Sequence, residues 1–182
     1  LETAEVFDAV AMRELAMALD TPALQHKILA LRIGGNDLMQ VLGIRRSRLD
    51  TLHEGPLAYV FKMLISTFGA RNFALTAPVC ELLDSPQLLL RELRQDIAHG
   101  LVGKTAIHPA QIPLIHAGLR VSLDEYQDAL RILNSDEAVF KSNGAMCEPA
   151  THRQWAKNTL MRAHLYGIEP DTSQPAAFVG LQ

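Results

Sequence analysis

Lys104, His108 and Gln111 lie close together in the sequence, around a short apolar segment. Residues 105–107 are predicted to form a buried strand, and a polar loop containing Pro109 follows it directly. An α/β barrel presents its chemistry in this way, in loops after the carboxyl ends of strands. Lys104 and His108 are therefore candidate catalytic residues. A structural role is an equal alternative for each, with Lys104 paired to a carboxylate and His108 fixing its loop by a hydrogen bond.

A second polar turn, Gly34-Gly-Asn-Asp37, follows another apolar run. Gly34 and Gly35 would let the backbone approach a ligand closely, so both glycines and Asn36 are candidate substrate-binding residues. The carboxylate of Asp37 would lie at the end of a strand, where it could hold a hard cation. The alternative is a simple turn in which Asn36 or Asp37 caps the next helix.

Glu2 occupies a comparable place if a strand ends at the start of the chain. Taken alone, a terminal glutamate is expected to be a solvated surface residue. Taken with Asp37, it gives two carboxylates at the ends of consecutive strands of one sheet. Such a pair could share one Mg²⁺, which prefers oxygen ligands and keeps positions for water and substrate.

Two other groups of residues are candidates for the wall of a pocket. Arg45, Arg46 and Arg48 form a basic cluster after the glycine turn. Exposed surface is the default interpretation for such a cluster, and contact between Arg45 and an anionic substrate or phosphate is the alternative. Thr76, Ala77 and Pro78 end a further predicted strand and are expected to line the pocket, with Glu81 as a weaker candidate.

The elements that must position these residues alternate between helix and strand. Helices are predicted over residues 5–19, 56–68 and 86–99, and strands over 28–33, 73–76 and 105–107. This alternation indicates parallel βαβ units. The later part is predicted to contain helices only, over 113–117, 122–133 and 151–166. We therefore expect an α/β part over residues 1–121, a helical extension over 122–170 and an irregular tail over 171–182.

The composition limits the class of protein. The 182 residues are 48% hydrophobic and 20% charged, enough apolar material for a sizeable core. A net charge of −3 and a pI near 6.2 argue against a nucleic-acid partner. A membrane helix needs roughly 18 apolar residues in a row, and none is present, so we expect a soluble, cytoplasmic protein. Cys80 and Cys147 lack metal-ligand spacing and are expected to be reduced thiols.

The number of strands raises a question about the start of the chain. Three strands are clear, and a fourth would lie at or before Leu1. The sequence begins in mid-pattern, because Leu1-Glu-Thr3 leads directly into a predicted helix and no methionine precedes it. We therefore expect that an N-terminal part is missing.

Three segments of the sequence resemble the HpcH/HpaI aldolase and citrate lyase β-subunit family, over about residues 1–165. They are Leu1-Glu-Thr-Ala4, the Gly34 to Leu38 turn with Leu42-Gly43 after it, and Gly103-Lys-Thr-Ala-Ile-His-Pro-Ala-Gln111, which is the most specific. Within that superfamily the chain most resembles a divergent branch of C–C bond lyases. The resemblance implies an α/β fold, namely the carboxyl-terminal half or more of a TIM (β/α)8 barrel with strands 5 to 8, followed by C-terminal helices.

The resemblance also implies a cofactor and a reaction. In the family Mg²⁺ is bound by a glutamate after the fifth strand and an aspartate after the sixth, which makes Glu2 and Asp37 the expected ligands of Mg²⁺, or of Mn²⁺ in its place. Family members cleave or form a C–C bond of a small oxo- or hydroxy-carboxylate, often carried as a coenzyme A thioester. Relatives also supply an arginine after the third strand, which this chain would lack. A small carboxylate and further copies of the chain, in a homo-oligomer, are the expected partners.

One segment departs from the family pattern. Relatives have a stretch resembling Asp-Gly-Lys-Met-Val-Asp before the last helix, and in some thioester lyases an acid from this region acts on a neighbouring subunit. The matching stretch here is Asn143-Gly-Ala-Met-Cys-Glu148. Because Asn143 cannot titrate, Glu148 is the candidate catalytic acid, and dependence on coenzyme A is in question.

Three functional hypotheses stay open at this point. The leading one is a Mg²⁺-dependent C–C bond lyase of the citrate lyase β type. The second is a non-catalytic barrel that keeps the metal site and binds a metabolite or regulates another protein. The third is a self-sufficient small α/β domain unrelated to lyases.

Overall fold

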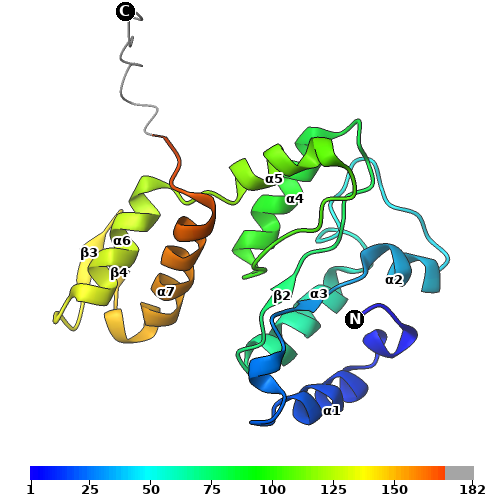
Figure 1. Cartoon of the computed structure of the whole chain (residues 1–182), viewed down its shortest axis with the longest axis horizontal. Coiled ribbons are helices and arrows are strands. Elements are labelled where there is room, and N and C mark those ends of the chain that lie inside the picture. The colour runs from blue at the N-terminus through cyan, green and yellow to red at the C-terminus, as the bar shows by residue number, and fades with distance from the viewer. Residues whose placement is uncertain (171–182) are drawn as a thin grey trace, which may run out of the picture. The chain divides into compact units, whose positions relative to one another are not determined.

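The computed structural model describes residues 1–170 and divides the chain into two compact units (Figure 1). The first unit is Leu1–Gly118 and the second begins at Leu119. Each unit is described by itself below. The irregular tail expected over residues 171–182 lies outside the described residues. Among the described helices, none combines the length and the apolar character that a membrane crossing requires.

The first unit opens with helical segments that lead into its sheet. A short 3₁₀ helix, η1 (Ala4–Phe7), precedes α1 (Ala9–Leu19). Asp8 separates the two and caps α1, since its carboxylate accepts a hydrogen bond from the backbone N–H of Val10 at 2.8 Å. A second 3₁₀ turn, η2 (Gln25–Lys27), then leads to β1 (Leu31–Arg32).

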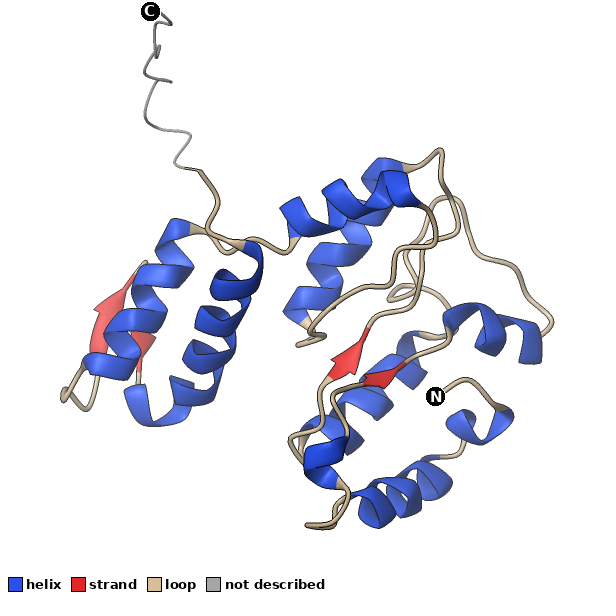
Figure 2. Cartoon of the chain, viewed as in Figure 1, coloured by secondary structure: helices blue, strands red, loops and turns tan. Residues whose placement is uncertain are grey.

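The sheet of this unit consists of short parallel segments in chain order. β1 pairs in parallel with β2 (Leu75–Thr76), and the two strands lie side by side in Figure 2. On one side of β1, the Leu1 amino group donates to the Arg32 carbonyl at 2.8 Å, and the Gly34 N–H donates to the Leu1 carbonyl at 3.0 Å. On the other side of β2, a parallel bridge joins Ala77 to Lys104. Leu1, β1, β2 and Lys104 thus lie in the order of consecutive barrel strands.

Two of the predicted strands were placed or sized wrongly. The strand predicted over 105–107 is reduced to the single bridge at Lys104, one residue earlier, and Ile107 is half exposed. The strand predicted over 28–33 is only β1, and Leu29 is almost fully exposed instead of buried. The runs of apolar residues predicted the right region for each strand but not its length. Residues outside the paired positions have no neighbouring strand with which to form hydrogen bonds.

Helices follow each sheet segment, as the alternation predicted. α2 (Gly35–Val41) comes directly after β1, and α3 (Ala58–Leu64) continues into a π-helical turn, η3 (Ile65–Gly69). α4 (Pro86–Ala98) begins with a proline at its first position, as expected from Ser85-Pro86. After Lys104 come a 3₁₀ turn, η4 (Pro109–Gln111), and α5 (Ile112–Gly118).

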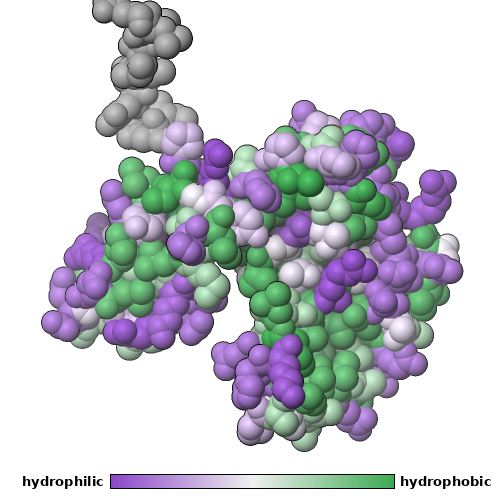
Figure 3. Space-filling view, in the orientation of Figure 1, coloured by the Kyte–Doolittle hydropathy of each residue, from purple (hydrophilic) through white to green (hydrophobic). Residues whose placement is uncertain are grey.

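The apolar core of the first unit lies between the sheet segments and the helices. Its largest fully buried members come from β1, α2, α3 and η3 and include Ile33, Leu38, Phe61, Leu64 and Phe68. Figure 3 shows that apolar side chains also gather on the surface of this unit around α1, where Val10 and Met17 are more than half exposed. The described part of this unit therefore leaves some apolar surface in contact with solvent.

A buried ion cluster joins α4 to two segments that lack regular structure. Glu92 of α4 accepts hydrogen bonds from Arg46 and from the Lys104 ammonium, the latter at 2.7 Å. Asp96, one turn later, pairs with Lys104 at 2.9 Å and with His53 Nε2 at 2.7 Å. The side chains of Arg46, Glu92, Asp96 and Lys104 are no more than 2% exposed. The expectation of an exposed surface was therefore wrong for Arg46, whose charge is paired within the interior.

The second unit combines two helices with a small hairpin. α6 (Leu123–Asn134) begins at Ser122, whose hydroxyl caps the helix by accepting a hydrogen bond from the Glu125 N–H at 3.2 Å. β3 (Phe140–Ser142) and β4 (Ala145–Cys147) form an antiparallel pair, and α7 (Pro149–Tyr166) follows. A core that includes Ile132, Phe140 and Ala156 holds these elements together.

The hairpin corrects the prediction that only helices follow residue 112. Its turn is Asn143-Gly144, and both residues have positive φ angles, 46° and 80°. Asparagine followed by glycine favours a tight two-residue hairpin turn, because both tolerate this backbone region. That signal was present in the sequence and was interpreted only as a family motif.

Glu92→Gln should destabilise the fold, because it removes a charge shared by two buried cations. Removing one partner of a buried ion pair costs about 3–5 kcal/mol of unfolding free energy. Urea unfolding followed by circular dichroism would measure the loss. Glu137→Gln is the matched control, since Glu137 and its partner Arg131 are about half exposed, and solvent screening should leave the unfolding midpoint little changed. Equal midpoints for both variants would contradict a structural role for the cluster.

Candidate functional site

Two carboxylates converge on Gly34, at the carboxyl end of β1. The backbone pairing of Leu1 with β1 brings Glu2 to this position, and α2 starts directly after Gly34, which places Asp37 in its first turn. A Cβ atom added to Gly34 would lie 2.8 Å from Asp37 Oδ2 and 3.0 Å from Glu2 Oε2. Both carboxylate oxygens therefore approach one point, and only a residue without a side chain fits there without a clash.

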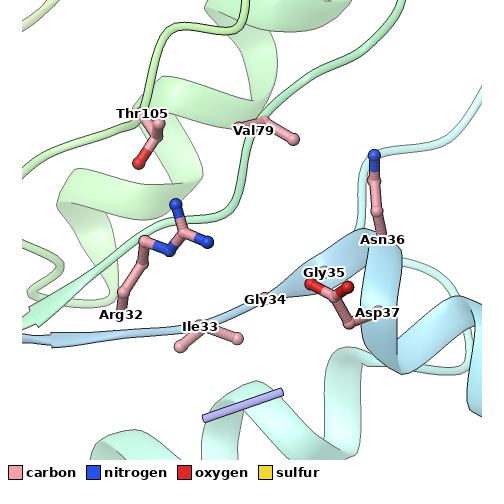
Figure 4. A pocket seen from close by; sticks show the side chains of 8 residues that line it. All are labelled: Arg32, Ile33, Gly34, Gly35, Asn36, Asp37, Val79 and Thr105. Atoms are coloured by element: carbon pink, nitrogen blue, oxygen red, sulfur yellow. The ribbon is translucent and has the colours of Figure 1, made fainter.

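A small pocket of about 240 Å³ lies beside this point (Figure 4). Its walls come from β1 and the start of α2, with one residue each from the segments after β2 and after Lys104. They are Arg32, Ile33, Gly34, Gly35, Asn36, Asp37, Val79 and Thr105. Glu2 lines a neighbouring, more open hollow together with residues of η1 and α1. Asp37 and Glu2 thus line two different hollows, and both side chains lie close to Gly34.

Strand alternation decides which side chains face the pocket. Ile33 is buried in the apolar core, so its neighbour Arg32 points to the opposite face of the sheet. Ala77 is fully buried and the Lys104 side chain reaches the buried ion cluster, so Thr76 and Thr105 also point to the opposite face. The pocket face of the sheet is therefore polar, whereas its other face packs on helices.

The donor set fits a hard divalent cation of the Mg²⁺ type. Within residues 1–170, no group of three or more histidine, cysteine or acidic side chains is arranged to hold a metal ion. Two carboxylates that converge suit Mg²⁺, which keeps several water ligands and uses one or two protein carboxylates. The close approach of both carboxylates to Gly34 is the structural observation that supports this fit.

Glu2 also has a cationic neighbour. The Arg32 guanidinium lies 3.7 Å from Glu2 Oε2, and both side chains are more than half exposed. A pair at this distance and exposure is weakly held. The Arg32 side chain can therefore change partners when a ligand enters the site.

Only some of the residues expected to bind substrate line the pocket. Gly34 and Asn36 line the pocket, as expected for the turn after β1. Gly35 also lines it, but its added Cβ would lie 2.7 Å from the Pro78 side chain, so this glycine is required for packing. Thr76 is partly exposed and Ala77 and Pro78 are buried, while Val79 contributes to the wall. Arg45 is exposed and does not line this pocket.

The loop after Lys104 is held by its own side chains. His108 Nδ1 accepts a hydrogen bond from the Ala110 N–H at 3.2 Å and so caps η4. Gln111 is buried, donates to the Cys80 carbonyl at 2.7 Å and accepts from the Ile107 N–H at 3.0 Å. These contacts favour the structural alternatives for His108 and, through the buried ion cluster, for Lys104.

Two other predicted features have defined environments. Cys80 and Cys147 are both free thiols, as expected. Burial raises the pKa of the Cys80 thiol above its usual value, which keeps it protonated and unreactive near neutral pH.

Glu148 is exposed at the N-cap of α7 in the second unit, without a side-chain capping bond.

Sequence analysis missed Arg32, Val79 and Thr105 as pocket residues. Arg32 lies inside a run that was interpreted as an apolar strand, and a charged residue in such a run was the available signal. Thr105 was assigned to a buried strand, although it directly follows the sheet residue Lys104. Val79 carried no sequence signal that distinguishes it from a core residue.

Comparisons with known proteins identify the family and the fold of the chain. The family model described as C–C bond lyase of the TIM-barrel fold matches residues 1–168. Among solved structures, CitE from Mycobacterium tuberculosis, in complex with magnesium, acetoacetate and coenzyme A, is 25% identical with a TM-score of 0.65. The match covers 86% of this chain and 57% of CitE. A search of curated proteins found no significant match.

Two further structures share the fold. RipC from Yersinia pestis is 25% identical with a TM-score of 0.51, over 64% of this chain and 48% of RipC. A citrate lyase from Burkholderia xenovorans LB400 is 18% identical with a TM-score of 0.66, over 94% of this chain and 54% of that protein, and shows the fold alone. The chain thus spans about half the length of these structures, and its sheet corresponds to part of their barrel. The chain belongs to the family of C–C bond lyases of the TIM-barrel fold.

Proposed function

We propose that this chain provides the metal-binding part of a Mg²⁺-dependent C–C bond lyase that acts on a small oxo- or hydroxy-carboxylate or its thioester. The observation that carries the proposal is the convergence of the Glu2 and Asp37 carboxylates at Gly34. Membership of the lyase family and the likeness to CitE, whose complex contains magnesium and acetoacetate, support it.

In this proposal, Glu2 and Asp37 hold the cation from two sides. Bound Mg²⁺, or Mn²⁺ in its place, would supply a Lewis acid for the oxygen atoms of an oxo acid. The absence of a side chain at Gly34 lets both carboxylates approach the same point. Asn36 and Thr105 line the pocket beside this space and offer hydrogen bonds that orient a small polar ligand.

The size of the pocket limits which part of a substrate it holds. The pocket is lined by only eight residues and is small, so it suits a small acid. In a thioester substrate, the coenzyme A portion would therefore lie outside this pocket. A proton-transfer role for Glu148 in a homo-oligomer belongs to the same proposal and is supported by the family resemblance.

A second candidate function is a metabolite-binding barrel that keeps the metal site without lyase chemistry. It is favoured by Asn143, which occupies the position of a family acid. Asn143 lies in the β3–β4 turn and donates a hydrogen bond to Asp128 Oδ2 at 2.9 Å, so it has a structural role there. A lyase should release an oxo acid from candidate hydroxy-acid thioesters, whereas a binder should only retain the oxo acid.

Asp37→Ala should abolish Mg²⁺-dependent binding of an oxo acid, because it removes one of the two carboxylates. Isothermal titration calorimetry with Mg²⁺, and then with pyruvate in its presence, measures both steps. Glu14→Gln is the control, since Glu14 is an exposed carboxylate of α1 that lines neither the pocket nor the adjoining hollow. Unchanged Mg²⁺ and pyruvate binding in Asp37→Ala would eliminate the proposed site.

Gly34→Ala should weaken Mg²⁺ binding by filling the space between the carboxylates. The new Cβ would lie 2.5 Å from Glu2 Cβ, so Glu2 must move away from Asp37. Gly69→Ala is the matched control, because nothing lies within 4 Å of its added Cβ. We expect at least a tenfold loss of Mg²⁺ affinity in Gly34→Ala only, measured by calorimetry. Equal affinities would show that the cation does not bind at this point.

A further inference from the structure

Arg32 is a cation beside the Glu2 carboxylate, and it lines the same pocket as Asp37. Figure 4 shows its side chain rising from β1 toward Thr105, with the Asp37 carboxylate at the start of α2. Within residues 1–170, the only partner recorded for the Arg32 guanidinium is Glu2 Oε2, at 3.7 Å. A guanidinium carries five N–H donors, so most of its hydrogen-bonding capacity is directed to the pocket and solvent.

The position of Arg32 is set by the sheet. Ile33 is 1% exposed in the apolar core, and alternation therefore directs Arg32 to the pocket face. Its register partner on β2 is Thr76, and Thr105 lines the same pocket. A long cationic side chain on this face cannot be explained by packing, because 58% of it is exposed.

The charges of the site change sign when a divalent cation binds. Without metal, the two negative charges of Glu2 and Asp37 exceed the single positive charge of Arg32. The exposed Glu2–Arg32 pair contributes little stability. With Mg²⁺ on the two carboxylates, their charge is neutralised and the guanidinium remains as an unmatched positive charge. Planar guanidinium groups bind carboxylates through paired hydrogen bonds. The loaded site is therefore suited to one further carboxylate.

We infer that Arg32 binds the carboxylate of the substrate, with the Thr105 hydroxyl as a second donor, and selects an oxo acid over a neutral carbonyl compound. The inference rests on the proposed function and names the group that recognises the acid. The alternative is that Arg32 only forms a surface ion pair with Glu2. The inference and this alternative predict different effects on ligand binding when the guanidinium is removed.

Mg²⁺ binding and pyruvate binding should respond differently to Arg32→Gln. Loss of a neighbouring positive charge should leave Mg²⁺ affinity unchanged or increase it. Loss of the paired hydrogen bonds should weaken pyruvate binding to the Mg²⁺-loaded chain by roughly tenfold or more. A variant that merely misfolds would lose both, so the pair of measurements separates recognition from damage to the fold.

The experiment compares pyruvate with pyruvamide, its neutral amide, by calorimetry on the Mg²⁺-loaded chain. The unmodified chain should prefer pyruvate, Arg32→Gln should lose most of that preference, and Arg32→Lys should keep part of it. Thr105→Val should weaken pyruvate binding less than Arg32→Gln does. Arg94→Gln is the matched control, because Arg94 is an exposed arginine of α4 outside the pocket.

The outcomes separate this inference from the proposed function. Unchanged pyruvate affinity in Arg32→Gln, or an equal loss for pyruvate and pyruvamide, would overturn the role of Arg32 while leaving the metal site intact. Absence of Mg²⁺ binding by the unmodified chain would overturn the metal site. In that case, metal-free pyruvate binding that Arg32→Gln abolishes would still support the arginine, and absence of such binding would overturn it.

Discussion

The arrangement of the first unit depends on the buried ion cluster around Glu92 and Asp96. Both carboxylates project from α4, and between them they bind Arg46, Lys104 and His53. Glu92 also accepts the Leu52 N–H at 3.0 Å, so the segment 46–53, which has little regular structure, is fixed to the helix through both side chains and backbone. A buried ion pair of this kind adds little net stability compared with apolar packing, but it strongly penalises every arrangement that separates its members.

The cluster also determines which residues reach the pocket. Because the Lys104 side chain is held between Glu92 and Asp96, behind the sheet, the next residue, Thr105, is directed to the front. The Arg46 guanidinium donates to the Val79 carbonyl at 3.3 Å, which fixes the segment after β2 that contributes the pocket wall. The polar face of the sheet is thus a consequence of the charged contacts on its opposite side.

The sequence was sufficient to predict the features that local chemistry determines. Asp37 could be placed because two glycines end an apolar strand, and the alternation of elements indicated parallel βαβ units. The burial of the Arg46 and Lys104 side chains could not be predicted in the same way. Whether a cation is buried depends on partners such as Glu92, which lies 46 residues from Arg46 in the sequence. Strand lengths could not be predicted from the sequence either, because they depend on which neighbouring strands supply hydrogen bonds.

The same strands therefore separate two electrostatic environments. Behind them, two cations and two carboxylates balance one another away from water, and such a set has no remaining charge for a ligand. In front, two carboxylates face one arginine across solvent-accessible space, and the negative charge is in excess. In the proposed function, a divalent cation would change one excess negative charge into one excess positive charge, and an anionic substrate would then restore neutrality. The count of charges on this face of the sheet therefore favours binding of the metal before the acid.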